Sequence, residues 1–451
     1  MTSDGAAATS PLGRSPALDV RTAAGSRPWW VWAAAAAAAV IVTRLAIIAA
    51  LYRLTGGAEF TDDTGMHLAL ADDPLLLISG NTAVHGQHPP LLPIMEWLLL
   101  APFRWLPDMV AIRLAYVMVE AGAVGATVLA LRPTQDHAKA ALPHPITHRN
   151  VFAIVVVLIL SPLLWMTSAV MAQDEVIAAA VLACALALWR SGRQIPAVAV
   201  LGIGVGGAKV FLVLPLVALV MLGPTAGRGR RAAVGAAVTT VPYVAAGLSA
   251  LARGNPLPLT GFDPNPTFGM NPWVFAFGDA GVSLGWAKVG STVLASAATL
   301  SLVFLLRRTR SDRFGTTTGS PVPVIASTIA AMFLVFFVTF YHATPEYLAL
   351  AVPAIALVPW RPVHHLGAHA ALSIAWAGNL FFGVANAKLS GAAEKASFVR
   401  LYDRIVPVEP LLLHRASIVA WTVSAVVVIV ALMRTASRHV ATPDAGQEIG
   451  G

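Results

Sequence analysis

Charged residues are scarce in this chain of 451 residues, since Asp, Glu, Lys and Arg together make up 12% of it. Soluble globular proteins contain about a quarter of such residues, so the composition excludes an ordinary soluble protein. Cysteine is scarcer still: Cys184 stands alone, which excludes an internal disulfide. Apolar length is what the sequence has instead, with 57% hydrophobic residues and a mean hydropathy of +0.73. Apolar stretches recur from Trp29 to Met433 and predict many membrane spans.

Motifs for nucleotide and metal chemistry are also missing. The sequence contains no phosphate-binding glycine loop followed by Lys-Ser or Lys-Thr, and no HExxH zinc pair. His85 and His88 have a spacing that could ligate a metal, but no second clustered pair accompanies them, so we predict no metal and no cofactor. The net charge of +8 and the pI near 10.0 do not indicate a nucleic-acid partner, because basic residues in a membrane chain chiefly record its orientation.

The apolar stretches predict an all-α polytopic membrane protein of about twelve transmembrane helices. Residues 1–28 are predicted to be a disordered basic tail and residues 435–451 a polar tail, so that one bundle occupies 29–434. Glycines, Lys209 and Pro215 interrupt the stretch 195–223, which predicts a broken helix or a short hairpin. The predicted spans are 29–51, 108–131, 151–170, 175–190, 195–207, 209–223, 232–251, 284–306, 322–341, 346–360, 366–385 and 411–433.

Basic residues predict which way each loop faces. With a cytoplasmic N-terminus, the inner segments collect about 18 of the 30 Lys and Arg residues, as the positive-inside rule requires. Both tails are then on the cytoplasmic side of the inner membrane, and the long first loop, 54–107, is extracytoplasmic. This loop carries acids but no basic residue up to Arg104, and its length indicates function. Pro89 and Pro90 lead into an apolar run that we expect to be a short interfacial helix.

Acidic residues gather at the outer ends of the predicted helices, where ionisable groups are costly and indicate function. Asp62 and Asp63 follow the first span; because they are adjacent, at most one of them points into a site, and Asp62 is slightly preferred. The alternative is that one of them caps the next helix. Gln173, Asp174 and Glu175 form a second polar position at a helix end. The alternative is a turn followed by a helix whose dipole stabilises an acid at its start.

Two further positions combine a polar group with a helix break. His342 and Glu346 lie in "HATPE", where the alternative is a helix that starts at proline with an acid in its first turn. Lys209 lies inside the broken stretch 195–223. It could hold a phosphate as a point charge, or it could only extend toward the membrane surface.

The order of these features resembles that of the polyprenyl-phosphate-dependent glycosyltransferases of the C superfold, which include bacterial mannosyltransferases. The resemblance is carried by the acids after the first span and by the stretches "HPPLLPIMEW", "AQDEV", "GGAKVFLVLP" and "HATPEYLALAVP". It covers most of the chain, although each motif is short. The sequence departs from mannosyltransferases of the phosphatidylinositol type, because "TDDTGMHLAL" and "QHPPL" stand where those commonly have Asp-Leu-x-Val-Tyr and Tyr-Pro-Pro. The sugar is therefore left open.

The resemblance implies an inverting glycosyltransferase that moves a sugar, with mannose favoured, from a polyprenyl-phosphate donor to a lipid or glycan acceptor on the extracytoplasmic face. It implies that Asp62 or Asp63 is the general base, and no general acid is needed because a lipid phosphate is already a good leaving group. The donor- and acceptor-binding residues that we expect are His342, Lys209, Glu346, Gln173, Asp174 and His88.

A multi-span transporter or lipid flippase is the alternative. Such proteins often contain inverted repeats and bind their substrates near the bilayer midplane, where Lys209, Arg44 and Glu120 could serve. The two halves of the chain show no convincing repeat, and the acids lie at helix ends, so the glycosyltransferase is favoured.

Overall fold

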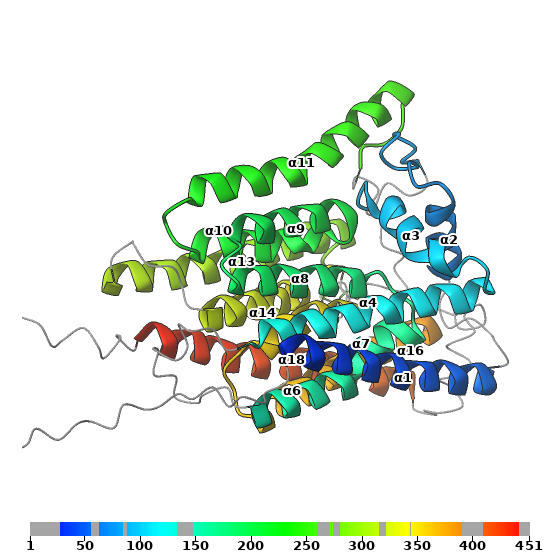
Figure 1. Cartoon of the computed structure of the whole chain (residues 1–451). Coiled ribbons are helices and arrows are strands. Elements are labelled where there is room, and N and C mark those ends of the chain that lie inside the picture. The colour runs from blue at the N-terminus through cyan, green and yellow to red at the C-terminus, as the bar shows by residue number, and fades with distance from the viewer. Residues whose placement is uncertain are drawn as a thin grey trace, which may run out of the picture.

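The protein is a bundle of helices that run roughly side by side, as Figure 1 shows for the computed structural model. Every regular element in the described part of the chain is a helix, which confirms the predicted all-α class. The described residues are 28–55, 63–83, 88–132, 148–258, 271, 273, 280–314, 322–342, 344–389 and 409–441.

The first half of the chain contains α1 (Trp29–Thr55), α2 (Asp63–Asp72), α3 (Leu92–Leu100), η1 (Ala101–Phe103), α4 (Asp108–Ala130), α6 (His148–Leu160), α7 (Pro162–Trp165), the π-helix η2 (Met166–Val170), α8 (Glu175–Arg190), α9 (Gln194–Gly207), η3 (Val210–Leu212) and α10 (Val213–Leu222). The second half contains α11 (Arg228–Arg253), α13 (Leu284–Phe314), α14 (Val322–Thr339), η4 (Pro345–Ala351), α15 (Val352–Ala356), α16 (Pro362–Leu389) and α18 (Pro410–Ala441).

Each predicted span falls on a helix, but the predicted count of twelve spans is not confirmed. Among the described residues, 7 helices are long and apolar enough to cross a membrane, or up to 8 if the bent pair Asn150–Leu160 and Pro162–Val170 forms one span. The segments α8, α9, η3–α10 and η4–α15 are shorter, because the chain breaks at glycine-rich or proline-rich sequence before they reach full length.

Apolar side chains fill the centre of the bundle and also cover its rim. In the most apolar 18-residue stretch of α14, 83% is buried, whereas the corresponding stretches of α1 and α11 are 17% and 22% buried. On α11, the apolar side chains of Val241 and Leu248 are each 64% exposed. Exposing so much apolar surface to water would be unfavourable, whereas the hydrocarbon interior of a membrane accommodates it. The helices therefore support a protein embedded in a membrane.

Helix-starting acids and helix-starting arginines lie at different ends of the bundle. Helices α4 and α8 start with Asp108 and Glu175 and finish beside Arg132 and at Arg190. Helix α11 starts with its arginines close to the end of α8, since Arg231 lies over the ring of Trp189. Helices α2 and α3 lie at the opposite end (Figure 1). We call these the arginine end and the acid end; which side of the membrane each one faces stays a prediction.

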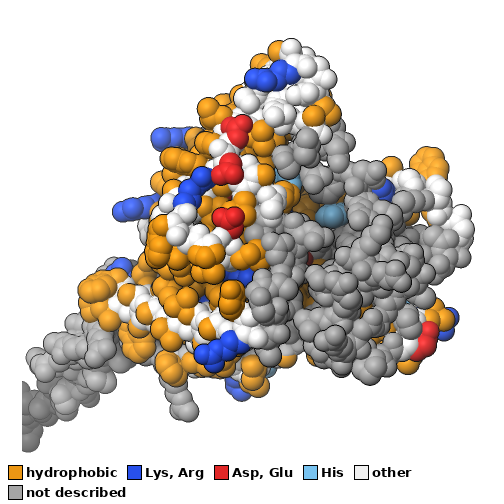
Figure 2. All heavy atoms as spheres, turned by 90° about the vertical axis from the view of Figure 1, so that its right-hand side faces the viewer, with side chains coloured by type: hydrophobic (Ala, Val, Ile, Leu, Met, Phe, Trp, Pro, Cys, Tyr) orange, Lys and Arg blue, Asp and Glu red, His pale blue; other side chains and the backbone are white. Residues whose placement is uncertain are grey.

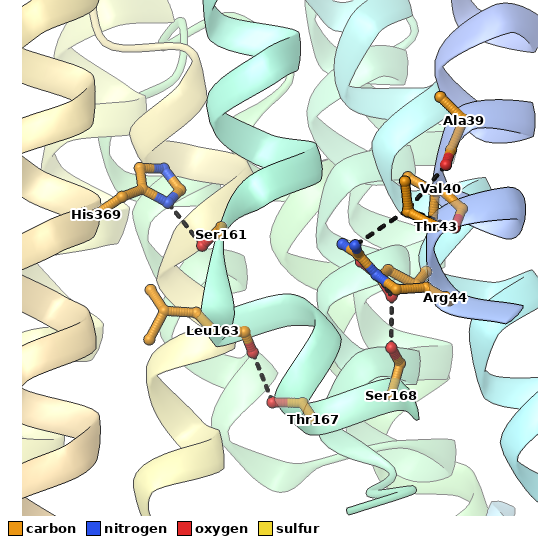
Figure 3. Close-up of polar contacts among 10 residues, drawn as sticks. Ala39, Val40, Thr43, Arg44, Ser161, Leu163, Thr167, Ser168 and His369 are labelled. Carbon is orange, nitrogen blue, oxygen red and sulfur yellow. Dashed lines mark hydrogen bonds and ion pairs between the residues drawn. The ribbon is translucent and has the colours of Figure 1, made fainter. Parts of the chain in front are cut away.

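A buried ion pair ties α1 to α4 inside the bundle. Arg44 Nη2 lies 2.6 Å from Glu120 Oε1, and Arg44 Nε lies 3.0 Å from Glu120 Oε2. Both side chains are almost completely buried. Ser168 of η2 donates a hydrogen bond to Glu120 Oε2, and Thr43 Oγ1 accepts one from Arg44 Nη1 at 3.2 Å. Figure 3 shows Thr43, Arg44 and Ser168 turned toward one another from their two helices.

A second buried polar contact holds the bend between α6 and α7. Ser161 interrupts the helical run, and its Oγ lies 2.8 Å from His369 Nδ1 of α16 (Figure 3). Proline at position 162 cannot continue the hydrogen-bond ladder of α6, so the bend has a local cause in the sequence.

Removing one partner of the Arg44–Glu120 pair should cost more than removing both. Glu120→Leu leaves a buried guanidinium without its carboxylate, which should lower the free energy of unfolding by about 3–5 kcal/mol. The double variant Arg44→Met/Glu120→Leu removes both charges and should recover most of this loss. Thermal unfolding in detergent micelles measures both; a double variant as unstable as the single one would contradict charge pairing as the source of the stability.

Candidate functional site

A buried cluster of one cation and two carboxylates lies where α8 begins. Lys209 Nζ is 2.8 Å from Asp174 Oδ1 and 2.7 Å from Glu175 Oε1, and the lysine side chain is 15% exposed. The ammonium also lies over the ring of Tyr347, 5.5 Å from its centroid. We call Asp174, Glu175 and Lys209 the lysine cluster. Its carboxylates outnumber its cation, so Lys209 is neutralised within the protein.

Irregular backbone brings the lysine cluster together. After the π-helix η2, Ala172 adopts a φ of 50°, a left-handed value that a residue with a Cβ rarely takes. Backbone strain of this kind concentrates at functional sites, and here it turns the chain so that Asp174 directly precedes α8. From the other side, α9 ends at Gly207 and Lys209 is extended before η3. Lys209 therefore lies at the break that the sequence predicts in 195–223.

The surrounding charges set the protonation of Asp174 and His342. Burial alone would raise the pKa of Asp174, but Lys209, followed by His67 and His88, lowers it below its ordinary value. Asp174 is therefore ionised at neutral pH. Burial, followed by the charge of Lys209, lowers the pKa of His342 to about 4. His342 is then neutral at neutral pH and offers a hydrogen bond, not a positive charge.

A second buried group joins α2, α3 and α4. Glu96 Oε1 accepts a hydrogen bond from the Tyr116 hydroxyl at 2.5 Å and lies 3.0 Å from His67 Nδ1. The rings of His67 and Tyr116 pack edge to face, with 5.7 Å between their centroids. All three residues are 0% exposed. We call His67, Glu96 and Tyr116 the histidine cluster.

The histidine cluster and the lysine cluster are neighbours at the acid end of the bundle. His67 acts electrostatically on Asp174, and both Asp174 and Glu175 act electrostatically on Tyr116. The backbone N–H of Leu91, just before α3, donates to the carbonyl of Gly206 in the last turn of α9 at 2.7 Å. Figure 2 looks onto this end and shows histidine side chains (pale blue) near its centre and acidic side chains (red) to one side.

Aromatic rings border the lysine cluster. Phe211, which follows Lys209 closely in the chain, lies 5.1 Å from Tyr347 and 5.2 Å from Phe337, centroid to centroid. Phe337 lies 5.0 Å from Tyr347, and the ring of His342 lies 6.0 Å from Tyr347. The ionised groups therefore meet an apolar aromatic surface, an arrangement typical of sites that bind a molecule with one polar and one apolar part.

The structure brings several of the expected site residues together. Asp174 and Lys209 are in direct contact. His88 lies close enough to lower the pKa of Asp174, and the charge of Lys209 acts on His342. These residues come from segments far apart in the sequence, so they form one region at the acid end.

The other expected residues have more varied positions. Glu346 is buried in the first turn of η4, as the helix-start alternative expects. Gln173 donates through its backbone N–H to the carbonyl of Thr167 at 2.9 Å, at the turn before α8. Asp62 lies outside the described residues, and Asp63 is the first residue of α2.

Sequence reasoning missed the partners that complete both clusters. Glu175 was named only as an acid at a helix start, and it is a direct partner of Lys209. Glu96 interrupts an apolar run, and this cost of placing an acid among apolar residues was the signal that could have identified it. His67 and Tyr116 gave no comparable signal, because a single aromatic residue beside apolar residues is usually part of the core.

No metal site accompanies these clusters: in the part of the chain that the structure describes, no group of three or more His, Cys, Asp or Glu side chains could hold a metal ion. Comparison with models of protein families, with curated proteins and with solved structures gives no match to this chain.

Removing Lys209 should destabilise the protein in a pH-dependent way. Lys209→Met leaves two adjacent buried carboxylates without a cation, which should cost about 3–5 kcal/mol at neutral pH. In the wild type, Lys209 opposes the effect of burial, so Asp174 stays ionised over this range; without Lys209, burial raises the pKa of both carboxylates. The deficit of the variant should therefore shrink between about pH 7.5 and pH 4.5, as the carboxylates take up protons.

Unfolding temperatures of the purified variant and the wild type across this pH range measure the difference. Arg253→Met, which replaces an exposed arginine at the end of α11, is the control and should change little at any pH. A deficit of Lys209→Met that is equal at both pH limits would contradict the ionic account of the cluster.

Proposed function

We propose that this protein is a membrane glycosyltransferase that moves a sugar, with mannose favoured, from a polyprenyl-phosphate donor to a lipid or glycan acceptor. The observation that carries the proposal is the meeting of the lysine cluster and the histidine cluster at the acid end, one helical turn from Asp63. Such an end suits a substrate whose hydrocarbon chain stays in the bilayer while its phosphate and sugar reach ionisable groups.

The proposed reaction needs few catalytic groups. The acceptor hydroxyl attacks the anomeric carbon from the face opposite the phosphate, so a new carbon–oxygen bond forms as the bond to the phosphate oxygen breaks and the configuration inverts. The hydroxyl proton passes to a general base, whose help is worth about 10²- to 10⁴-fold in rate. The polyprenyl phosphate leaves as a stable anion, so it needs hydrogen-bond donors but no general acid.

One of the adjacent carboxylates Asp62 and Asp63 is the proposed base. Helix α2 starts at Asp63 and carries the buried His67 four positions later. Residues separated by four positions share one face of a helix, so position 63 belongs to the face of α2 that turns to the bundle. This register favours Asp63 over Asp62. Asp174, which stays ionised, is the next candidate.

The donor phosphate is proposed to bind between Lys209 and His342. A lysine ammonium has three N–H donors, and Asp174 and Glu175 engage two of them. The third can donate to a phosphate oxygen while the carboxylates hold the ammonium in place. A neutral His342 adds a hydrogen bond without competing for the carboxylates. Glu346, Gln173 and His88 are the remaining residues proposed to contact donor or acceptor.

The contacts of the charged residues inside the bundle, Arg44 and Glu120, support an enzyme over a transporter or flippase. The transporter alternative uses Arg44 and Glu120 as substrate-binding groups inside the bundle. In the structure these two bind each other, and Ser168 donates a hydrogen bond to Glu120. In the proposed topology the chain crosses the membrane twelve times. The short segments α8, α9, η3–α10 and η4–α15 provide four of these crossings. Both termini and the arginine end are then cytoplasmic, and the acid end is extracytoplasmic.

Asparagine substitutions test the base. Asp63→Asn should lower the transfer rate by about 10²- to 10⁴-fold, because the amide cannot accept the hydroxyl proton. Asp62→Asn should cost about 1 kcal/mol of stability if that side chain caps α2, and it should leave turnover largely intact. The measurement is sugar transfer from polyprenyl-phosphate mannose to extracted membrane lipids by each purified variant. Rates near wild type in both would reject this carboxylate pair and direct attention to Asp174 and Glu346.

Cysteine labelling tests the orientation. The region of Gly80 suits a reporter, but Gly80 itself does not, because its φ is 88° and a Cβ there would collide with the backbone of Ser249. Asn81→Cys avoids this collision, and Gly229→Cys marks the arginine end, where a Cβ meets open space. Both are made in a Cys184→Ala background, since Cys184 is exposed.

An impermeant thiol reagent should label Asn81→Cys in intact cells and should label Gly229→Cys only after the membrane is opened. The opposite pattern would reverse the orientation and would remove an extracytoplasmic reaction from consideration.

A further inference from the structure

We propose that Glu96 is a positioning residue that holds the first half of α2, and Asp63 with it, against the bundle through His67. The hold itself follows from the contacts of the histidine cluster. Its role for Asp63 rests on the proposed function, in which Asp63 is the base.

Helix α2 is attached mainly to the two helices that contribute to the histidine cluster. It packs extensively on α3 and also contacts α4. Its buried face consists of His67, Leu70 and Ala71, all at most 1% exposed. These positions are three and four residues apart, so they form one stripe along the helix. Position 63 extends this stripe by one turn toward the start of α2.

The two ends of α2 are held in different ways. At the last turn, Arg104 Nη2 donates to the carbonyl of Ala71 at 2.6 Å, and Arg104 Nη1 lies 3.1 Å from Asp72 Oδ1. The Arg104 and Asp72 side chains are 45% and 73% exposed, so water competes for this pair. Nearer the start of α2, the contact between His67 and Glu96 is fully buried. The position of the first turn therefore depends on the histidine cluster.

The chemistry of Glu96 makes this contact demanding. One oxygen, Oε1, faces both the Tyr116 hydroxyl and His67 Nδ1. The 3.0 Å contact between this carboxylate oxygen and the imidazole nitrogen is favourable when a proton lies between the two atoms. Lifting α2 away would separate the buried polar groups of Glu96 and His67, which carries the desolvation penalty of unsatisfied polar groups.

The histidine cluster also connects α2 to the lysine cluster. Helix α3 carries Glu96 and is fixed at its start by the hydrogen bond from Leu91 N to Gly206 O. Gly206 lies in the last turn of α9, directly before the break that holds Lys209. The chain of contacts runs from α2 through Glu96 and α3 to the segment of Lys209. The proposed base on α2 and the proposed phosphate-binding Lys209 are thereby connected through one set of packed helices.

Amide hydrogen exchange of α2 in the full-length protein in detergent tests the hold without any assay of activity. His67→Leu removes the imidazole that contacts Glu96, and the amides of 66–70, which the helix itself hydrogen-bonds, should exchange at least about tenfold faster. His67→Asn keeps an N–H close to the position of Nδ1 and should stay within about twofold of the wild type. Glu96→Gln removes the charge but not the acceptor and should give an intermediate rate. His365→Leu, which replaces a fully buried histidine outside these clusters, is the control and should leave α2 unchanged.

The hold is refuted if His67→Leu leaves the exchange of 66–70 at the wild-type rate, or if His67→Asn exchanges as fast as His67→Leu. Glu96→Gln covers the case in which His67→Leu does not fold, because it changes no apolar packing. An unchanged exchange rate of 66–70 in Glu96→Gln would equally reject a charge-assisted contact.

The kinetic consequence separates this proposal from the proposed function. If the wild type transfers sugar, His67→Leu should lower kcat by up to about 10²-fold with little change in KM for the donor, because a small displacement of a catalytic group has that effect. His67→Asn should restore kcat. A wild type that transfers no sugar would reject the proposed function while the exchange rates still decide the hold. Faster exchange with an unchanged kcat would reject Asp63 as the group that is positioned.

Discussion

The need to neutralise charge inside an apolar bundle is the constraint on which the rest of this structure depends. An ionised group away from water requires an opposite charge or several hydrogen bonds. The Arg44–Glu120 pair, the lysine cluster and the histidine cluster all meet this requirement with side chains from different helices. Each group therefore fixes the relative position of segments that are far apart in the sequence. Apolar packing alone specifies such positions weakly, because one leucine or alanine surface resembles another.

The ionisable clusters lie where the helices are interrupted, and this coincidence has a physical reason. An uninterrupted apolar helix has no place for a charged side chain except at its ends. The break after η2, the break at Lys209 and the start of η4 create additional helix ends next to the core. Exposed carbonyl and N–H groups at such ends, together with a strained residue such as Ala172, allow polar side chains to converge there. The short segments thus locate the site.

Much of this could be predicted from the sequence, and the remainder was hidden for one reason. The apolar stretches gave the all-α class and the location of each helix, and the glycine-rich sequence gave the break at Lys209. The count of twelve spans is not confirmed, because composition does not reveal how long each apolar helix is, and α9 ends after 14 residues. Spacing along the chain sets the register of each helix but not its neighbours. The pairing of Glu175 with Lys209 and of Glu96 with His67 is a matter of neighbours, so it required the structure.

The central claim is that a lipid-linked phosphate and its sugar bind at the acid end, between the lysine cluster and the start of α2. The most direct measurement is an electron cryo-microscopy map of the full-length protein in lipid nanodiscs with a non-transferable polyprenyl-phosphate sugar analogue. The account predicts phosphate density within hydrogen-bonding distance of Lys209 or His342, with the sugar toward α2. Phosphate density beside Arg44 and Glu120 inside the bundle, or no bound analogue at saturating concentration, would contradict it.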